Sequence, residues 1–143
     1  MKQIINKMKL TVAARSVNEG FSRCAVSAFA AQADPTVGEL TDIRTVVSEA
    51  VTNAIIHGYR EHPEGEVYIT VKLFDDRSLV INVRDKGCGI PDIKKAMEPL
   101  YSGDPSGERG GMGFTIMQSF SDSLNVRSIP GKGTSVTVRK KLK

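Results

Sequence analysis

The strongest constraint on the fold is a helical apolar stripe that is replaced, halfway along the chain, by strict alternation. From Val37 to Ala54 the apolar residues recur every three or four positions, which predicts an amphipathic helix. Asp34 is expected to cap this helix and Pro35 to lie in its first turn. The helix is expected to end near Gly58, before a loop that contains proline and glycine.

Alternation follows directly after this loop. Apolar residues occupy every second position over Val67–Leu73 and again over Leu79–Val83, with a polar turn at residues 75–78 between them. This pattern predicts an antiparallel hairpin whose second strand runs into Asp85. A helix followed at once by a hairpin favours segregated helices and strands, as in an α+β fold, over a repeating βαβ pattern.

The other expected elements complete one domain over residues 1–143. They are a strand around Met8–Val12, helices at Val17–Ala31 and Phe114–Phe120, a short helix after Pro91, and strands at Leu124–Ile129 and Thr134–Lys140. Their sum is an α+β two-layer sandwich, with a mixed, mainly antiparallel sheet covered on one face by helices. Residues 97–112 show no periodicity, and a loop of this length in a compact domain is usually functional, here as a lid.

Composition narrows the class of protein. A hydrophobic content of 40% and a charged content of 25% are typical of a globular protein. No apolar run reaches the roughly 18 residues that span a membrane, and no secretory signal is present, so the expected location is the cytoplasm. The net charge of +4 is mild, and no dense basic and aromatic patch predicts direct nucleic-acid binding.

Glu49 and Asn53 are the first candidates for a functional site. They lie four residues apart and therefore project from the same face of the predicted helix. An amide oxygen is a suitable single ligand for Mg²⁺, which keeps waters and nucleotide phosphates as its other ligands. A glutamate one turn away could act as a general base toward a hydroxyl that attacks a terminal phosphate. The alternative is an ordinary polar edge on an amphipathic helix.

A second candidate is the segment Asp85–Gly89. A carboxylate at the end of a buried strand needs a hydrogen-bond donor, and an adenine amino group would provide one. Gly87 and Gly89 would let the base pack against the backbone. The alternative is a glycine turn capped by Asp85.

A third candidate is the run from Arg109 to Gly113, which leads into the last predicted helix. Unpaired amides at a helix N-terminus favour a polyphosphate, and Arg109 could meet its terminal group. The alternatives are a flexible connector and a solvated arginine.

In this order, Glu-x-x-x-Asn, Asp-x-Gly-x-Gly, Gly-x-Gly and Gly-Lys-Gly-Thr resemble the ATPase superfamily of gyrase, Hsp90, histidine kinases and MutL. The segments at 48–59 and 108–114 look in particular like the anti-sigma-factor serine kinases of sporulation. The resemblance spans nearly the whole chain and implies the histidine-kinase-like ATPase fold, with ATP and Mg²⁺ as cofactors.

By this resemblance, each motif acquires a role. Glu49 would be the catalytic base and Asn53 the Mg²⁺ ligand. The remaining residues would hold the nucleotide: Asp85 at the adenine amino group, Gly87 and Gly89 beside the base, Gly111 and Gly113 at the phosphates, and Thr134 at the adenine edge.

The same resemblance implies a homodimer that inhibits a sigma factor. It also implies phosphorylation of a serine on an anti-anti-sigma protein. Two alternatives remain at this point: a nucleotide-gated binding switch, and the catalytic domain of a histidine kinase. The latter would need a helical hairpin bearing a phospho-accepting histidine, and neither His57 nor His62 is followed by one.

Overall fold

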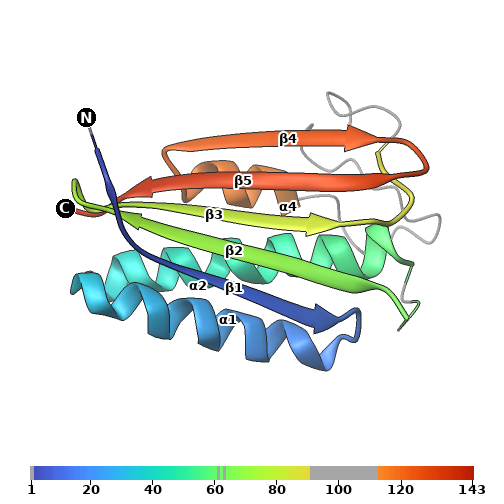
Figure 1. The fold of residues 1–143 in the computed structure, drawn as a ribbon, viewed down its shortest axis with the longest axis horizontal. Helices are drawn as coiled ribbons and strands as arrows, with labels where there is room; N and C mark the ends of the chain where they lie inside the picture. The colour runs from blue at the N-terminus through green and yellow to red at the C-terminus, as the bar shows by residue number, and fades with distance from the viewer. Residues whose placement is uncertain (1, 61, 63, 91–112) are drawn as a thin grey trace.

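The computed structural model describes residues 2–60, 62, 64–90 and 113–143. The chain forms a five-stranded sheet with helices on one face (Figure 1). The elements follow in this order: β1 (Ile4–Ala13), α1 (Val17–Ala30), η1 (Ala31–Ala33), α2 (Val37–Thr52), η2 (Asn53–Gly58), β2 (Glu66–Phe74), β3 (Ser78–Asp85), α4 (Gly113–Ser119), β4 (Ser123–Ile129) and β5 (Gly133–Lys141). The predicted two-layer α+β sandwich is confirmed.

The sheet has the strand order β1-β2-β3-β5-β4, and each of the four neighbouring pairs is antiparallel. The mixed sheet that we expected is therefore antiparallel throughout the described part of the chain. Such a sheet can leave one face to solvent, and this one does, because α1, α2 and α4 all lie on the same side (Figure 1). None of the described helices is long and apolar enough to cross a membrane.

The core lies between the sheet and these helices. Strand residues that face the helices alternate with residues on the open face, as the burial of β2 shows most clearly. The largest fully buried side chains come from both layers, and they include Ile43, Ile55, Ile69, Leu79, Ile81 and Met117.

The start of α2 differs from the prediction. Thr36, not Asp34, is the N-cap residue, and it forms a capping box with Glu39. The Thr36 hydroxyl accepts from the Glu39 amide at 3.0 Å, and the Glu39 carboxylate accepts from the Thr36 amide at 2.9 Å. Asp34 instead adopts a left-handed conformation (φ 53°) at the end of η1, which turns the chain between the two helices. The capping box satisfies two amides that would otherwise have no partner within the helix.

The end of α2 continues without a break into a π-helical turn. This turn, η2, spans Asn53–Gly58, so the helical rod ends at Gly58 as predicted. In a π turn the hydrogen bonds span five residues instead of four, and such turns occur mostly at functional sites. The turn begins at one predicted site residue and ends beside another, because Gly58 packs against Asp85.

Candidate functional site

Glu49 and Asn53 lie together beside the first residue of α4. A Cβ added to Gly113 would lie 3.1 Å from Asn53 Nδ2 and 3.3 Å from Glu49 Oε2. Both side chains are half-buried, and α2 and α4 are in direct contact. The structure therefore brings three of the predicted site residues together, with a glycine where any side chain would press on the amide and the carboxylate.

The environment of Glu49 favours its protonated form. Burial raises the pKa of its carboxyl group above the ordinary value, and the negative charge of Glu19 on α1 adds to the effect. Glu19 itself pairs with Arg23 one turn along α1, with 3.5 Å between Oε1 and the guanidinium. A carboxylate whose pKa is raised is a stronger base once ionised, which suits proton abstraction.

Asp85 lies at the end of β3, and 7% of its surface is exposed. Its carboxylate accepts the Gly87 amide at 2.9 Å, as expected for an aspartate that caps a glycine turn. Burial nevertheless raises the pKa of Asp85, while the bonds from the backbone of Gly87 and Thr134 oppose the rise. A carboxylate offers about four acceptor positions, so capping leaves capacity for a further donor.

Gly87 is held against the end of the helical rod. A Cβ at this position would lie 2.0 Å from the Gly58 carbonyl oxygen, so only glycine fits without a shift of the backbone. The same oxygen accepts the Cys88 amide at 2.8 Å. Gly58 in turn has no room for a side chain, because its Cβ would lie 2.8 to 2.9 Å from the Asp85 carboxyl group. These close contacts tie the helix that carries Asn53 to the loop after β3.

Gly89 and Thr134 lie where the same loop meets the turn between β4 and β5. Gly89 has a φ of +76°, and a Cβ there would lie 2.4 Å from the Ile129 oxygen. Thr134 is paired with Asp85 in the sheet, and its hydroxyl lies 2.9 Å from that of Ser128. Ser128 also accepts the Ile90 amide at 2.7 Å. The predicted residues Asp85, Gly89 and Thr134 thus belong to one connected structure.

Tyr59 was missed by the sequence analysis, yet it joins three parts of this structure. Its hydroxyl donates to the Glu66 carbonyl at 2.6 Å and accepts the Lys86 amide at 2.6 Å. Its ring fills the space where a side chain at Gly65 would lie. No local pattern marks this role, because Lys86 is 27 positions away in the chain. Ser128 is a second missed residue, and its partner Ile90 is likewise remote.

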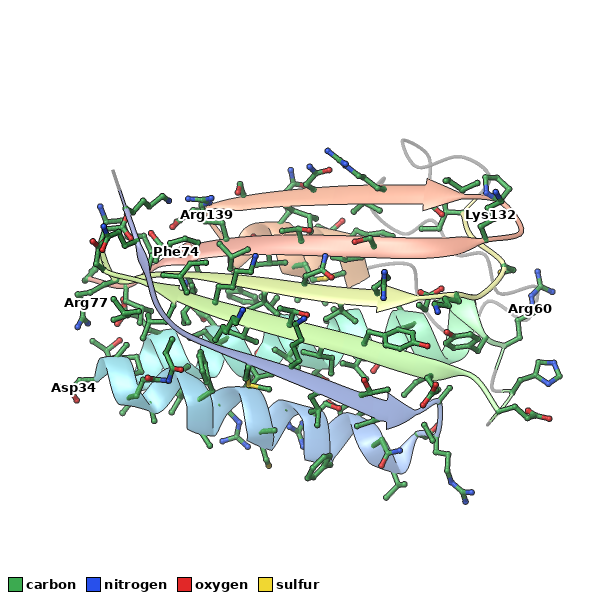
Figure 2. All side chains as sticks on the ribbon, in the orientation of Figure 1. Asp34, Arg60, Phe74, Arg77, Lys132 and Arg139 are labelled. Carbon is green, nitrogen blue, oxygen red and sulfur yellow. The ribbon has the colours of Figure 1, made fainter. Side chains whose placement is uncertain are left out.

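The glycine turns gather at one end of the sheet, where Figure 2 also shows Lys132 and Arg60. Arg109, Gly111, the expected helix after Pro91 and the expected lid at 97–112 lie outside the described residues. In the described part of the chain, no cluster of three or more His, Cys, Asp or Glu side chains could hold a metal on its own. The oxygens of Asn53 and Glu49 are nevertheless hard donors of the kind that Mg²⁺ takes beside phosphates and waters.

The fold and these motifs define a class, the histidine kinase-like ATPase domain, and the model of that family matches residues 12–140. Solved structures agree with this class. The crystal structure of the RsbU and RsbW domains of Rv1364c from Mycobacterium tuberculosis aligns with a TM-score of 0.69 at 18% identity, covering 96% of this chain and 32% of that chain. The catalytic domain of histidine kinase ThkA aligns with a TM-score of 0.57 at 19% identity, covering 72% of this chain and 68% of that chain.

Curated relatives are closer in sequence. The chain is 57% identical to the anti-sigma F factor of Shouchella clausii, over 96% of this chain and 93% of the relative. It is 52% identical to the anti-sigma F factor of Bacillus subtilis, again over 96% and 93%. The chain therefore belongs to the histidine kinase-like ATPase family and, within it, to the group of the anti-sigma F factors.

Proposed function

We propose that this protein binds and inhibits a sigma factor and, with Mg-ATP, phosphorylates a serine on an anti-anti-sigma protein. The observation that carries the kinase part is the pair Glu49 and Asn53 at the start of α4. A half-buried carboxylate with a raised pKa lies there beside an amide oxygen and a glycine. The sigma-factor part rests on the similarity to proteins named anti-sigma F factor.

Glu49 acts as the general base in this proposal. Its carboxylate takes the proton of the serine hydroxyl while the serine oxygen forms a bond to the γ-phosphorus, and the bond to the leaving ADP oxygen breaks. Asn53 would hold Mg²⁺, which neutralises charge on the phosphate oxygens when it is bound. Arg109, Gly111 and Gly113 would contact the phosphates.

Asp85 fixes the other end of the nucleotide. Its carboxylate accepts the adenine amino group with the acceptor capacity left by the Gly87 amide, and Gly87, Gly89 and Thr134 border the base. The tight packing of Gly87 against Gly58 supports this role, because it sets the position of the acceptor relative to Asn53. Since an adenine has an amino donor where guanine has an oxygen, the arrangement favours ATP over GTP.

We also infer that residues 1–143 form one domain and act as a cytoplasmic homodimer. One sheet and one core account for the described residues, and the family resemblance supports the dimer. Light scattering coupled to size exclusion would measure the dimer directly, and a monomer at micromolar concentration would overturn this part alone.

The deciding experiment is phosphotransfer from γ-labelled ATP with Mg²⁺ to a candidate anti-anti-sigma protein. Label that survives acid and is lost in alkali identifies a phosphoserine product. Acid-labile label identifies histidine chemistry, and ATP binding without transfer identifies a nucleotide-gated switch. Either of these two outcomes contradicts the kinase proposal.

Two variants separate the base from general effects. Glu49→Gln should reduce transfer by about 10²- to 10⁴-fold while ATP affinity changes little. Glu64→Gln, at an exposed glutamate in the loop before β2, is the matched control and should transfer phosphate normally. Near-normal transfer by Glu49→Gln would remove Glu49 from the catalytic role.

A further inference from the structure

The open face of the sheet carries an unusual excess of positive charge. On the strands, residues that alternate with the core positions point away from the helices. Glu66 is the only acidic strand residue on this side. We define the basic face by its cationic residues, which are Lys7, Lys9, Lys72, Arg84, Arg127 and Arg139.

Strand register places these cations around a neutral centre. Lys9 is paired with Thr70, which is paired with Asn82, and Asn82 with Thr137. The Asn82 amide donates to the hydroxyls of Ser135 at 2.9 Å and Thr137 at 3.0 Å. The middle of the face is therefore a level platform of short polar side chains whose hydrogen bonds are largely made within the sheet. The long cationic side chains stand around it.

The cations of the basic face are not neutralised within the described part of the chain. The ion pairs there join Lys2 to Asp76, Arg23 to Glu19 and Lys140 to Asp42, and none includes a residue of the basic face. Lys7 and Lys72 even lie directly opposite each other on neighbouring strands. Like charges in that position destabilise a sheet. An anionic partner would relieve this repulsion.

We propose that the basic face is a docking surface for an acidic segment of a partner protein. The charge of the face requires an anionic occupant, and its flatness and breadth suit a protein surface. This proposal is independent of the nucleotide site, because Glu49 and Asn53 lie on the helical layer behind the sheet.

Tyr68 argues against a nucleic acid as the occupant. Sheets that bind single strands offer exposed aromatic rings on which bases stack. Here the Tyr68 ring has the Arg84 guanidinium 5.0 Å from its centroid and the Lys86 ammonium 5.1 Å from it. These cations occupy the ring through cation–π contacts, so the one aromatic residue near the middle of the face is not free to stack.

A lipid surface is also a poor match. Membrane-binding surfaces combine cations with large apolar side chains that enter the bilayer interface. The large apolar residues that are exposed on this side, Ile5 and Ile129, lie on the two edge strands and not within the platform. Phe74, at the strand end, is covered by the Lys2 ammonium 5.2 Å from its ring centroid (Figure 2).

The test compares two double variants that change net charge equally. Lys9→Glu/Arg84→Glu reverses two cations of the basic face, and Arg15→Glu/Arg44→Glu reverses two exposed arginines elsewhere. The probe is a fluorescent peptide of alternating glutamate and serine, titrated with the full chain at low and physiological salt. We expect the face variant to bind at least about tenfold more weakly than the parent, and the control variant within about twofold.

Equal loss in the two variants would show attraction by net charge alone and would overturn the proposal. A single-stranded oligonucleotide or a phosphatidylserine vesicle that binds the basic face more tightly than the peptide would overturn it as well. Nucleotide affinity, measured in the same samples, should be unchanged in both variants. If the glutamates unfold the protein, Lys9→Gln/Arg84→Gln tests the same surface, with a smaller loss expected.

Discussion

Removal of the Tyr59 hydroxyl tests whether the two halves of the site are held together as described. In Tyr59→Phe the ring still fills the space beside Gly65, but the bonds to the Glu66 carbonyl and the Lys86 amide are lost. A typical hydrogen bond contributes about 1 kcal/mol net. Because Tyr59 is half-buried and water can reach part of this region, we expect the free energy of unfolding to fall by about 1–2 kcal/mol.

The same change should weaken nucleotide binding. Lys86 follows Asp85 directly, so loss of its amide bond loosens the loop that presents the carboxylate and Gly87. If about 1 kcal/mol is then needed to order the loop on binding, the dissociation constant for ATP rises roughly fivefold. Urea unfolding measures the first effect, with an unchanged slope against denaturant, and titration with a fluorescent ATP analogue measures the second.

Tyr68→Phe is the matched control for this experiment. Tyr68 lies on β2, and its hydroxyl makes only a long contact of 3.5 Å to the Glu66 carboxylate. Its loss should leave both stability and ATP affinity almost unchanged. If Tyr59→Phe behaves like Tyr68→Phe in both assays, the hydroxyl does not couple the helix to the loop, and the argument is wrong.

Three further predictions concern the helical side of the site. Gly113→Ala places a Cβ 3.1 Å from Asn53 Nδ2, so ATP affinity in Mg²⁺ should fall while the melting temperature changes little; unchanged affinity would contradict the crowding. Glu19→Gln removes a negative charge that raises the pKa of Glu49, so the acid limb of the pH–rate profile should move to lower pH, because the base then stays ionised in more acidic solution. A shift to higher pH would refute the sign. Thr36→Ala removes the side-chain half of the capping box and should cost about 1 kcal/mol of unfolding free energy in urea, without effect on the ATP dissociation constant.

The alternating and helical periods predicted the layers of this protein well, because each period directly reflects which face is buried. The hairpin of β2 and β3, the last two strands and the helix ending at Gly58 all occur where the pattern indicated. The cap of α2 was wrong because Asp34 and Thr36 are both good capping residues. The Thr-x-x-Glu spacing of the capping box was the signal that distinguished them.

The site was predictable to the extent that its chemistry is local. The spacing of Glu49 and Asn53 and the glycines after Asp85 are visible as short patterns, and the structure brings Gly113 to the first pair. Tyr59 was not predictable, since its partners come from other strands and a tyrosine after a helix has no special pattern. The same holds for Gly58, whose need for glycine arises only from the approach of Asp85.

The π turn η2 makes the length of this stretch of chain unusually critical. A π turn contains one residue more than an α turn would need, so it is equivalent to a single-residue insertion in a regular helix. Deletion of one residue between Asn53 and Gly58 would let the segment relax to an ordinary helix, and it would rotate everything beyond it by about 100°. Gly58 would then no longer meet Asp85 and Gly87. Sequences that share this site should therefore keep the Asn53–Gly58 interval free of insertions and deletions, even where the loop after it varies in length.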